Sequence, residues 1–204
     1  MLLTPTSAAR AIAVFANQRG MLRTREALQL GIHPRTLYQL RDAGEIAQVG
    51  RGLYRLANRE ALSNPDWVVI AAKAPNAVFC LVSALAYHRL TTQVPHTIDI
   101  AIPNHSQVPH IDDLPIRAFW YSAASLSAGV QIVNIDGVAV RLFNPERTIA
   151  DCFKYRNKIG LDVAIEALRS YRERNGRKAM KSLLEYAEIC RVKKVMFPYL
   201  EALL

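Results

Sequence analysis

Cysteine is scarce in this sequence, and the three that occur form no recognisable pair. Cys80, Cys152 and Cys190 are far apart among 204 residues, and none belongs to a Cys-x-x-Cys motif. An odd number of isolated cysteines favours neither a disulfide framework nor a zinc ribbon, and we therefore expect a reducing, cytoplasmic environment. Cys152 and Cys190 fall on apolar faces of predicted helices, which is typical of core residues rather than nucleophiles.

Long apolar runs and common catalytic motifs are also missing. The longest apolar run, residues 77–87, has about half of the roughly 20 residues that a membrane span requires. The N-terminus lacks the basic stretch followed by an apolar stretch that is typical of a secretory signal. Neither a phosphate-binding loop, a dinucleotide-binding glycine motif nor a G-x-S-x-G elbow occurs. These absences predict a protein that is not membrane-inserted, not an enzyme and without a cofactor.

A metal site is the best enzyme-like alternative, but its pattern is poor. The candidate ligands span fifteen positions, and their spacing matches neither a helical H-E-x-x-H motif nor a known zinc pattern. They lie in or beside residues 103–115, which we expect to form an exposed loop. We therefore predict no metal. These candidates are Asp99, His105, His110, Asp112 and Asp113.

Lysine is absent from the first sixty residues, whereas arginine is abundant there. The whole chain has a net charge of +9, and residues 1–60 contribute +5 from nine arginines and four acidic residues. Residues 61–146 carry −2 and residues 147–204 carry +6. Guanidinium groups suit phosphate and guanine recognition, so the N-terminal charge indicates a nucleic-acid partner. The alternative that basic residues only solvate exposed faces stays open at this point.

Apolar periodicity and turn residues predict three helices and a hairpin in residues 1–60. Helices are expected over residues 4–19, 24–30 and 34–43, and Gly31 allows the turn between the last two. Two short strands, residues 45–49 and 53–57, are joined by Gly50-Arg51-Gly52. This order predicts a winged helix-turn-helix domain over residues 1–60. His33 before Pro34 is expected to cap the third helix.

The third helix carries the candidate DNA-binding residues. Leu37 and Leu40 are expected to face inward, which leaves the polar positions on outer or flanking faces. We expect base contacts in the major groove from three of them and backbone contacts from two, while a residue at the hairpin tip reaches a minor groove or a phosphate. In that order these residues are Arg35, Thr36 and Gln39, then Tyr38 and Arg41, then Arg51.

Residues 61–204 are predicted to form a second, α+β domain with a small, mainly antiparallel sheet and C-terminal helices. Strands are expected over residues 97–102, 116–121, 130–135 and 138–143, and Asp136-Gly137 is a strong hairpin signal. Its basic residues are open to three interpretations: DNA contact, antitoxin function or solvation. They are Lys154, Arg156, Lys158, Arg169, Arg172, Arg174, Arg177, Lys178 and Lys181.

Three blocks of sequence together resemble one known family. ALQLGIHPRTLYQLRDAGEIAQVGRGLYRLA, LVSALAYHRLTTQVPHTIDIAIP and NPERTIADCFKYRNKIGLDVAIEALRSY resemble the AbiEi family, the antitoxins and transcriptional regulators of type IV toxin-antitoxin systems. The resemblance implies negative autoregulation through inverted repeats in the protein's own promoter, with double-stranded operator DNA as a partner. It also implies that the C-terminal domain counters a nucleotidyltransferase-like toxin without a tight complex.

Two alternatives from other classes remain. One is a non-enzymatic interaction module whose basic C-terminal face docks an acidic protein or RNA. The other is a ligand-responsive repressor.

Overall fold

The computed structural model describes residues 6–111, 114–176 and 180–202. The chain divides into two compact units. The first comprises the residues up to Ala74 together with Asn134–Ala139, and the second comprises Pro75–Val133 and Val140–Leu204. The predicted domain boundary at residue 60 stays a prediction, because compactness does not show which segment folds by itself.

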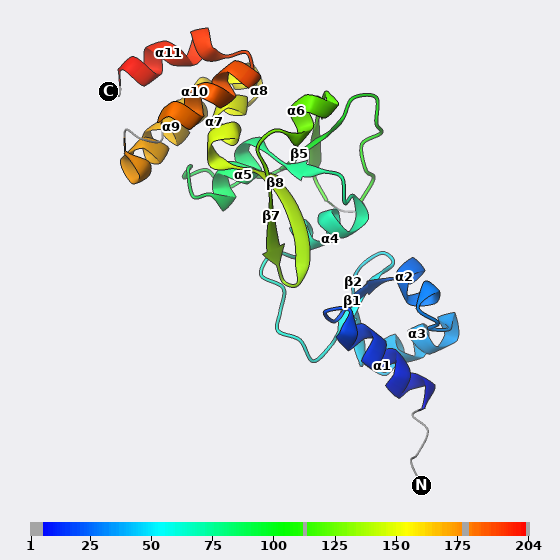
Figure 1. The fold of residues 1–204 in the computed structure, drawn as a ribbon. Helices are drawn as coiled ribbons and strands as arrows, with labels where there is room; N and C mark the ends of the chain where they lie inside the picture. The colour runs from blue at the N-terminus through cyan, green and yellow to red at the C-terminus, as the bar shows by residue number, and fades with distance from the viewer. Residues whose placement is uncertain (1–5, 112–113, 177–179, 203–204) are drawn as a thin grey trace. The chain divides into compact units, whose positions relative to one another are not determined.

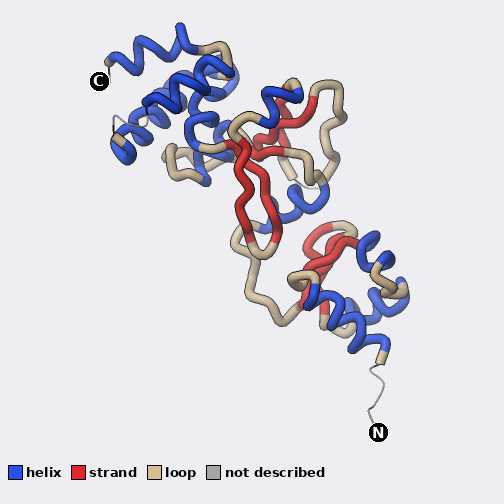
Figure 2. Tube along the Cα trace, viewed as in Figure 1, coloured by secondary structure: helices blue, strands red, loops and turns tan. Residues whose placement is uncertain are grey.

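The first unit combines four helices with a three-stranded antiparallel sheet of order β1-β3-β2 (Figures 1 and 2). Its core gathers Phe15 of the first helix, Ala27 of the second and Leu37 of the third, all without exposed surface. Its elements are α1 (Ser7–Asn17), β1 (Met21–Arg23), α2 (Thr24–Gln29), α3 (Pro34–Asp42), β2 (Ile46–Gly50), β3 (Leu53–Leu56) and α4 (Pro65–Lys73).

The turn between α2 and α3 forms as the sequence predicts. Gly31 has φ +83°, a left-handed conformation that side chains with a Cβ rarely adopt. His33 caps α3, because its Nδ1 accepts a hydrogen bond from the Arg35 amide at 3.2 Å. Pro34 occupies the first helical turn, where a missing N–H costs nothing.

Two details of the first unit differ from expectation. Met21–Arg23 is a strand, β1, that pairs with β3; three residues are too few to show a period of two. Thr24 does not cap α2. Its hydroxyl donates instead to the Gly52 carbonyl at 3.3 Å, and the Glu26 carboxylate accepts from the Arg23 amide at 2.8 Å at the start of that helix.

The second unit contains a five-stranded sheet of order β6-β5-β4-β8-β7, and the tip of the β7–β8 hairpin groups with the first unit. The helices α7, α9, α10 and α11 gather together (Figure 1). The elements are β4 (Val78–Phe79), α5 (Leu81–Tyr87), β5 (Ile98–Pro103), β6 (Ile116–Tyr121), α6 (Ala123–Ser127), β7 (Val130–Ile135), β8 (Val138–Phe143), α7 (Pro145–Lys154), α8 (Arg156–Ile159), α9 (Leu161–Asn175), α10 (Met180–Ile189) and α11 (Lys193–Glu201).

The α+β class is confirmed, but the larger sheet is more mixed than predicted. Strand β4 is antiparallel to β5, whereas β5–β6 and β4–β8 are parallel pairs. A parallel pair needs a connection of about a dozen residues. The segment 104–115 between β5 and β6 has that length, so the chain returns and β6 runs beside β5 in the same direction. Across the described ranges, no helix is long and apolar enough to cross a membrane.

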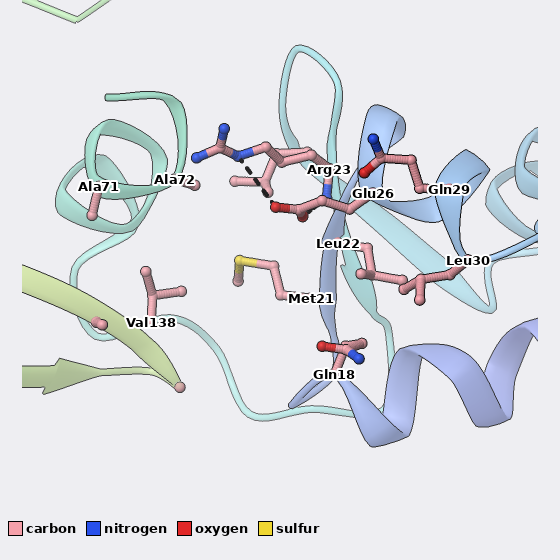
Figure 3. A pocket seen from close by; sticks show the side chains of 13 residues that line it. Gln18, Met21, Leu22, Arg23, Glu26, Gln29, Leu30, Ala71, Ala72 and Val138 are labelled. Carbon is pink, nitrogen blue, oxygen red and sulfur yellow. Dashed lines mark hydrogen bonds and ion pairs between the residues drawn. The ribbon is translucent and has the colours of Figure 1, made fainter. Parts of the chain in front are cut away.

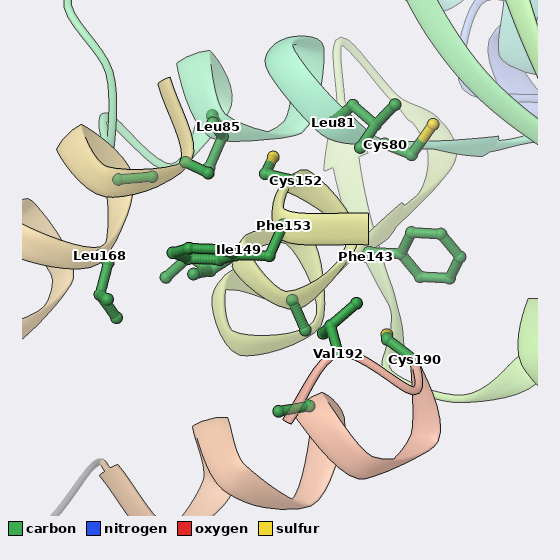
Figure 4. Packing of buried hydrophobic residues seen from close by; sticks show 14 of the residues in the cluster. Cys80, Leu81, Leu85, Phe143, Ile149, Cys152, Phe153, Leu168, Cys190 and Val192 are labelled. Atoms are coloured by element: carbon green, nitrogen blue, oxygen red, sulfur yellow. The ribbon is translucent and has the colours of Figure 1, made fainter. Parts of the chain in front are cut away.

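The core of the second unit surrounds α7 (Figure 4). Ile149, Cys152 and Phe153 of α7 have no exposed surface and pack among α5, α9 and α10. The expectation that Cys152 and Cys190 are core residues is confirmed, since both are buried free thiols. Burial raises the pKa of both thiols, which keeps them protonated and poorly nucleophilic.

Candidate nucleic-acid interface

Helix α3 presents a polar face to solvent. Leu37 and Leu40 are 0% and 3% exposed, so the inward face lies where the sequence predicts. Arg35, Tyr38 and Gln39 are exposed, and their spacing of three and four residues places them together on the opposite face. The structure thus brings three of the predicted side chains into one group.

The other two predicted residues of α3 lie on its flanks. Thr36 is half-buried and lines a shallow hollow with residues of α1 and with His33. Arg41 is exposed, but its Nε and Nη2 donate to Asp42 Oδ1 at 2.9 and 2.8 Å. These hydrogen bonds raise the pKa of Arg41 and offset its charge. Asp42 was not part of the sequence prediction, although its adjacency to Arg41 was the available signal.

Arg51 lies on an exposed turn that is anchored to α2. The Thr24 amide donates to the Gly52 carbonyl at 2.9 Å, in addition to the hydroxyl bond. The hairpin tip therefore lies beside the start of α2. Arg25, the next residue along α2, is exposed there as well. It was missed as a candidate, and the signal that could have found it is an arginine in the first turn of the first helix of a helix-turn-helix.

A hollow of about 510 Å³ in the first unit has no catalytic lining (Figure 3). Its polar groups include Gln18, Gln29 and the ion pair between Arg23 and Glu26, whose Nε and Oε1 are 3.9 Å apart. Met21, Leu22 and Val138 supply apolar surface. The lining includes no serine, threonine, cysteine or histidine, so the hollow lacks the usual side chains for nucleophilic catalysis.

The candidate metal ligands do not assemble. Asp99 is fully buried and accepts from Arg117 Nε and Nη2 at 2.7 and 3.0 Å and from the Val82 amide at 3.2 Å. Desolvation raises the pKa of Asp99, although Arg117 opposes this shift. His105 is exposed on the loop that follows β5. Asp112 and Asp113 lie outside the described residues, and within those ranges no three histidine, cysteine or acidic side chains are grouped to hold a metal ion.

Comparison with known proteins agrees with the regulator interpretation of the first unit. This unit is a small α+β module in which two helices, separated by a tight turn, precede a hairpin. Residues 9–57 match the family model described as transcriptional regulator, AbiEi antitoxin. The predicted AbiEi resemblance is therefore confirmed over this region, which contains α3 and the hairpin.

A solved structure shares the fold. The crystal structure of RV2827C protein from Mycobacterium tuberculosis aligns with a TM-score of 0.53 and 14% sequence identity. The alignment covers 94% of this chain and 80% of that chain. At this identity the likeness concerns the fold alone. No curated protein matches the chain.

Proposed function

We propose that this protein is a DNA-binding transcriptional autorepressor and the antitoxin of a type IV toxin-antitoxin system, acting in the cytoplasm and without enzymatic activity. Residues 1–60 act as a winged helix-turn-helix that binds inverted repeats in the protein's own promoter. The observation that carries the proposal is the exposed polar face of α3, within the region that matches a family of transcriptional regulators.

Helix α3 enters the major groove with Arg35 and Gln39 as its main base-reading side chains. Arg35 can donate two hydrogen bonds to guanine, and Gln39 can pair with adenine through its amide. Four helical residues correspond to an axial rise of about 6 Å, and base pairs are about 3.4 Å apart, so these two side chains reach bases about two steps apart. Thr36 supports base contact from the flank.

The DNA backbone is contacted from the edges of this surface. Tyr38 offers its hydroxyl to a phosphate, and Arg41 keeps guanidinium donors that Asp42 does not occupy. Arg51 on the hairpin turn reaches a phosphate or the adjacent minor groove. Arg25 joins it, because the bonds from Thr24 to Gly52 hold the turn beside the start of α2.

The second unit counters a nucleotidyltransferase-like toxin without forming a tight complex. The family description of the N-terminal region as an AbiEi antitoxin supports this part of the proposal. Co-expression with the product of the neighbouring gene tests it: growth should be restored by the full chain, and the two proteins should not co-purify. Failure to restore growth contradicts the antitoxin role.

DNA binding is tested with the segment upstream of the protein's own gene in a gel-shift assay. Arg35→Ala should cost about 1–3 kcal/mol and relax specificity at one base pair, whereas Arg51→Ala should weaken all sequences alike. Arg169→Ala, which removes an exposed arginine on α9, is the matched control. If Arg35→Ala and Arg51→Ala together leave the affinity unchanged, the assignment of the interface is wrong.

A further inference from the structure

Two lysines of the second unit lie over one group of aromatic rings. Lys154 Nζ is 5.2 Å from the ring centroid of Tyr121 and 5.4 Å from that of Tyr155. Lys158 Nζ is 5.6 Å from the centroid of Phe119 and 5.9 Å from that of Tyr155. We call these five residues the lysine–aromatic cluster. Because both ammonium groups lie near the Tyr155 ring, they are within about 11 Å of each other.

The positive charges of this cluster are not offset by acidic side chains. Neither Lys154 nor Lys158 forms an ion pair with a carboxylate in the described part of the chain. Neighbouring Arg117 also lies over Phe119, but its charge is paired with Asp99 at 2.7 Å. An aromatic face attracts an ammonium group without neutralising it. The rings therefore hold two positive charges in place while their remaining N–H donors face solvent.

The rings themselves are not available as a stacking platform. Phe119 and Tyr121 are each 2% exposed, and Tyr155 is half-buried. Proteins that hold single-stranded nucleic acid commonly stack bases on exposed aromatic side chains. A surface that offers ammonium groups but covers its rings favours contact with phosphates instead. Successive phosphates rise about 3.4 Å along one strand of duplex DNA, so two ammonium groups at this separation reach phosphates within about three steps.

We propose that the lysine–aromatic cluster binds the phosphate backbone of duplex DNA, which gives the second unit a sequence-independent contact of its own. The identity of the polyanion rests on the function proposed above for the first unit. The cluster adds affinity at any sequence, whereas α3 supplies the preference for one sequence. Part of the basic charge of residues 147–204 thereby has a defined role.

The test uses the full chain and a charge-matched pair of double variants. Lys154→Met with Lys158→Met removes both charges, while the long apolar side chains keep their packing against the rings. Lys181→Met with Lys194→Met removes the same charge from two other exposed lysines of the second unit. Circular dichroism spectra and urea midpoints verify that both double variants fold as the parent does.

Binding to a 30-base-pair duplex of random sequence is measured by fluorescence anisotropy between about 50 and 300 mM KCl. For the cluster variant we expect the slope of log affinity against log salt to flatten by about 1.8, because each lost phosphate contact contributes about 0.9. Affinity at 0.1 M salt should fall by an order of magnitude or more. The control variant should keep most of the parent slope.

Equal changes in both double variants, or no change in either, overturn the proposal, since the charge would then act diffusely or not at all. A loss confined to single-stranded DNA, to RNA or to an acidic protein also overturns it. The outcome is separable from that of the proposed function. Sequence preference is read from the parent's ratio of affinities for its own upstream DNA and the random duplex, which the cluster variant should leave unchanged.

Discussion

The second unit contains a fully buried ion pair whose removal should be costly. Arg147 and Asp151 of α7 have no exposed surface, and Arg147 Nε donates to Asp151 Oδ2 at 2.9 Å. Arg147 Nη2 donates to Ser125 at 2.9 Å. The Tyr121 hydroxyl and the Cys190 thiol donate to the same carboxylate at 3.1 and 3.2 Å. This network joins β6, α6, α7 and the end of α10.

Arg147→Met should destabilise the second unit by about 2–4 kcal/mol. Removing one partner of a buried ion pair typically costs about 3–5 kcal/mol, because the other charge stays buried. Two effects reduce that figure. Asp151 keeps two neutral donors, and the variant removes Nη1, a buried donor that lacks a hydrogen-bond partner. An unsatisfied buried donor costs about 1–3 kcal/mol.

Urea unfolding measured by tryptophan fluorescence provides the assay. Trp120 lies in the second unit and Trp67 in the first, so a Trp67→Phe background confines the signal to the second unit. Arg141→Met is the control, because Arg141 is half-buried with a single long hydrogen bond of 3.3 Å, and it should cost less than about 1 kcal/mol. A loss below about 1 kcal/mol for Arg147→Met would refute the reasoning. The deficit should also shrink at acidic pH, where the lone Asp151 can take up a proton.

Two further predictions concern stability. Burial lowers the pKa of His88, whose Nε2 donates to the Phe143 carbonyl at 2.8 Å, so protonation favours the unfolded state; the second unit should lose stability as the pH falls from about 7 to 5, and His88→Gln, which keeps a donor, should flatten this dependence in urea titrations. Equal pH slopes would contradict the role of His88. Gly31→Ala should cost the first unit about 1–2 kcal/mol through backbone strain alone, because no atom lies within 4 Å of the added Cβ; Trp67 fluorescence in a Trp120→Phe background measures it, and an unchanged midpoint would count against strain.

Local patterns predicted much of the first unit because its decisive features are local. Leu37 and Leu40 share a face through helical spacing, and the His33-Pro34 start of α3 depends on adjacent residues. The pairing of Arg41 with Asp42 is also local, yet it was overlooked. Strand β1 was not predictable from its own residues, because it exists through its pairing with β3, about thirty positions away.

The C-terminal charge shows why part of the candidate site was beyond sequence reasoning. Lys154 and Lys158 looked like ordinary basic residues at helix ends, where attraction to the helix dipole explains them. Their distinguishing contacts are with Phe119 and Tyr121 of β6, more than thirty positions earlier. That proximity depends on the return of the chain through residues 104–115, which makes β6 parallel to β5. A sheet predicted as mainly antiparallel did not imply this placement, so the lysines could be counted from the sequence but not located.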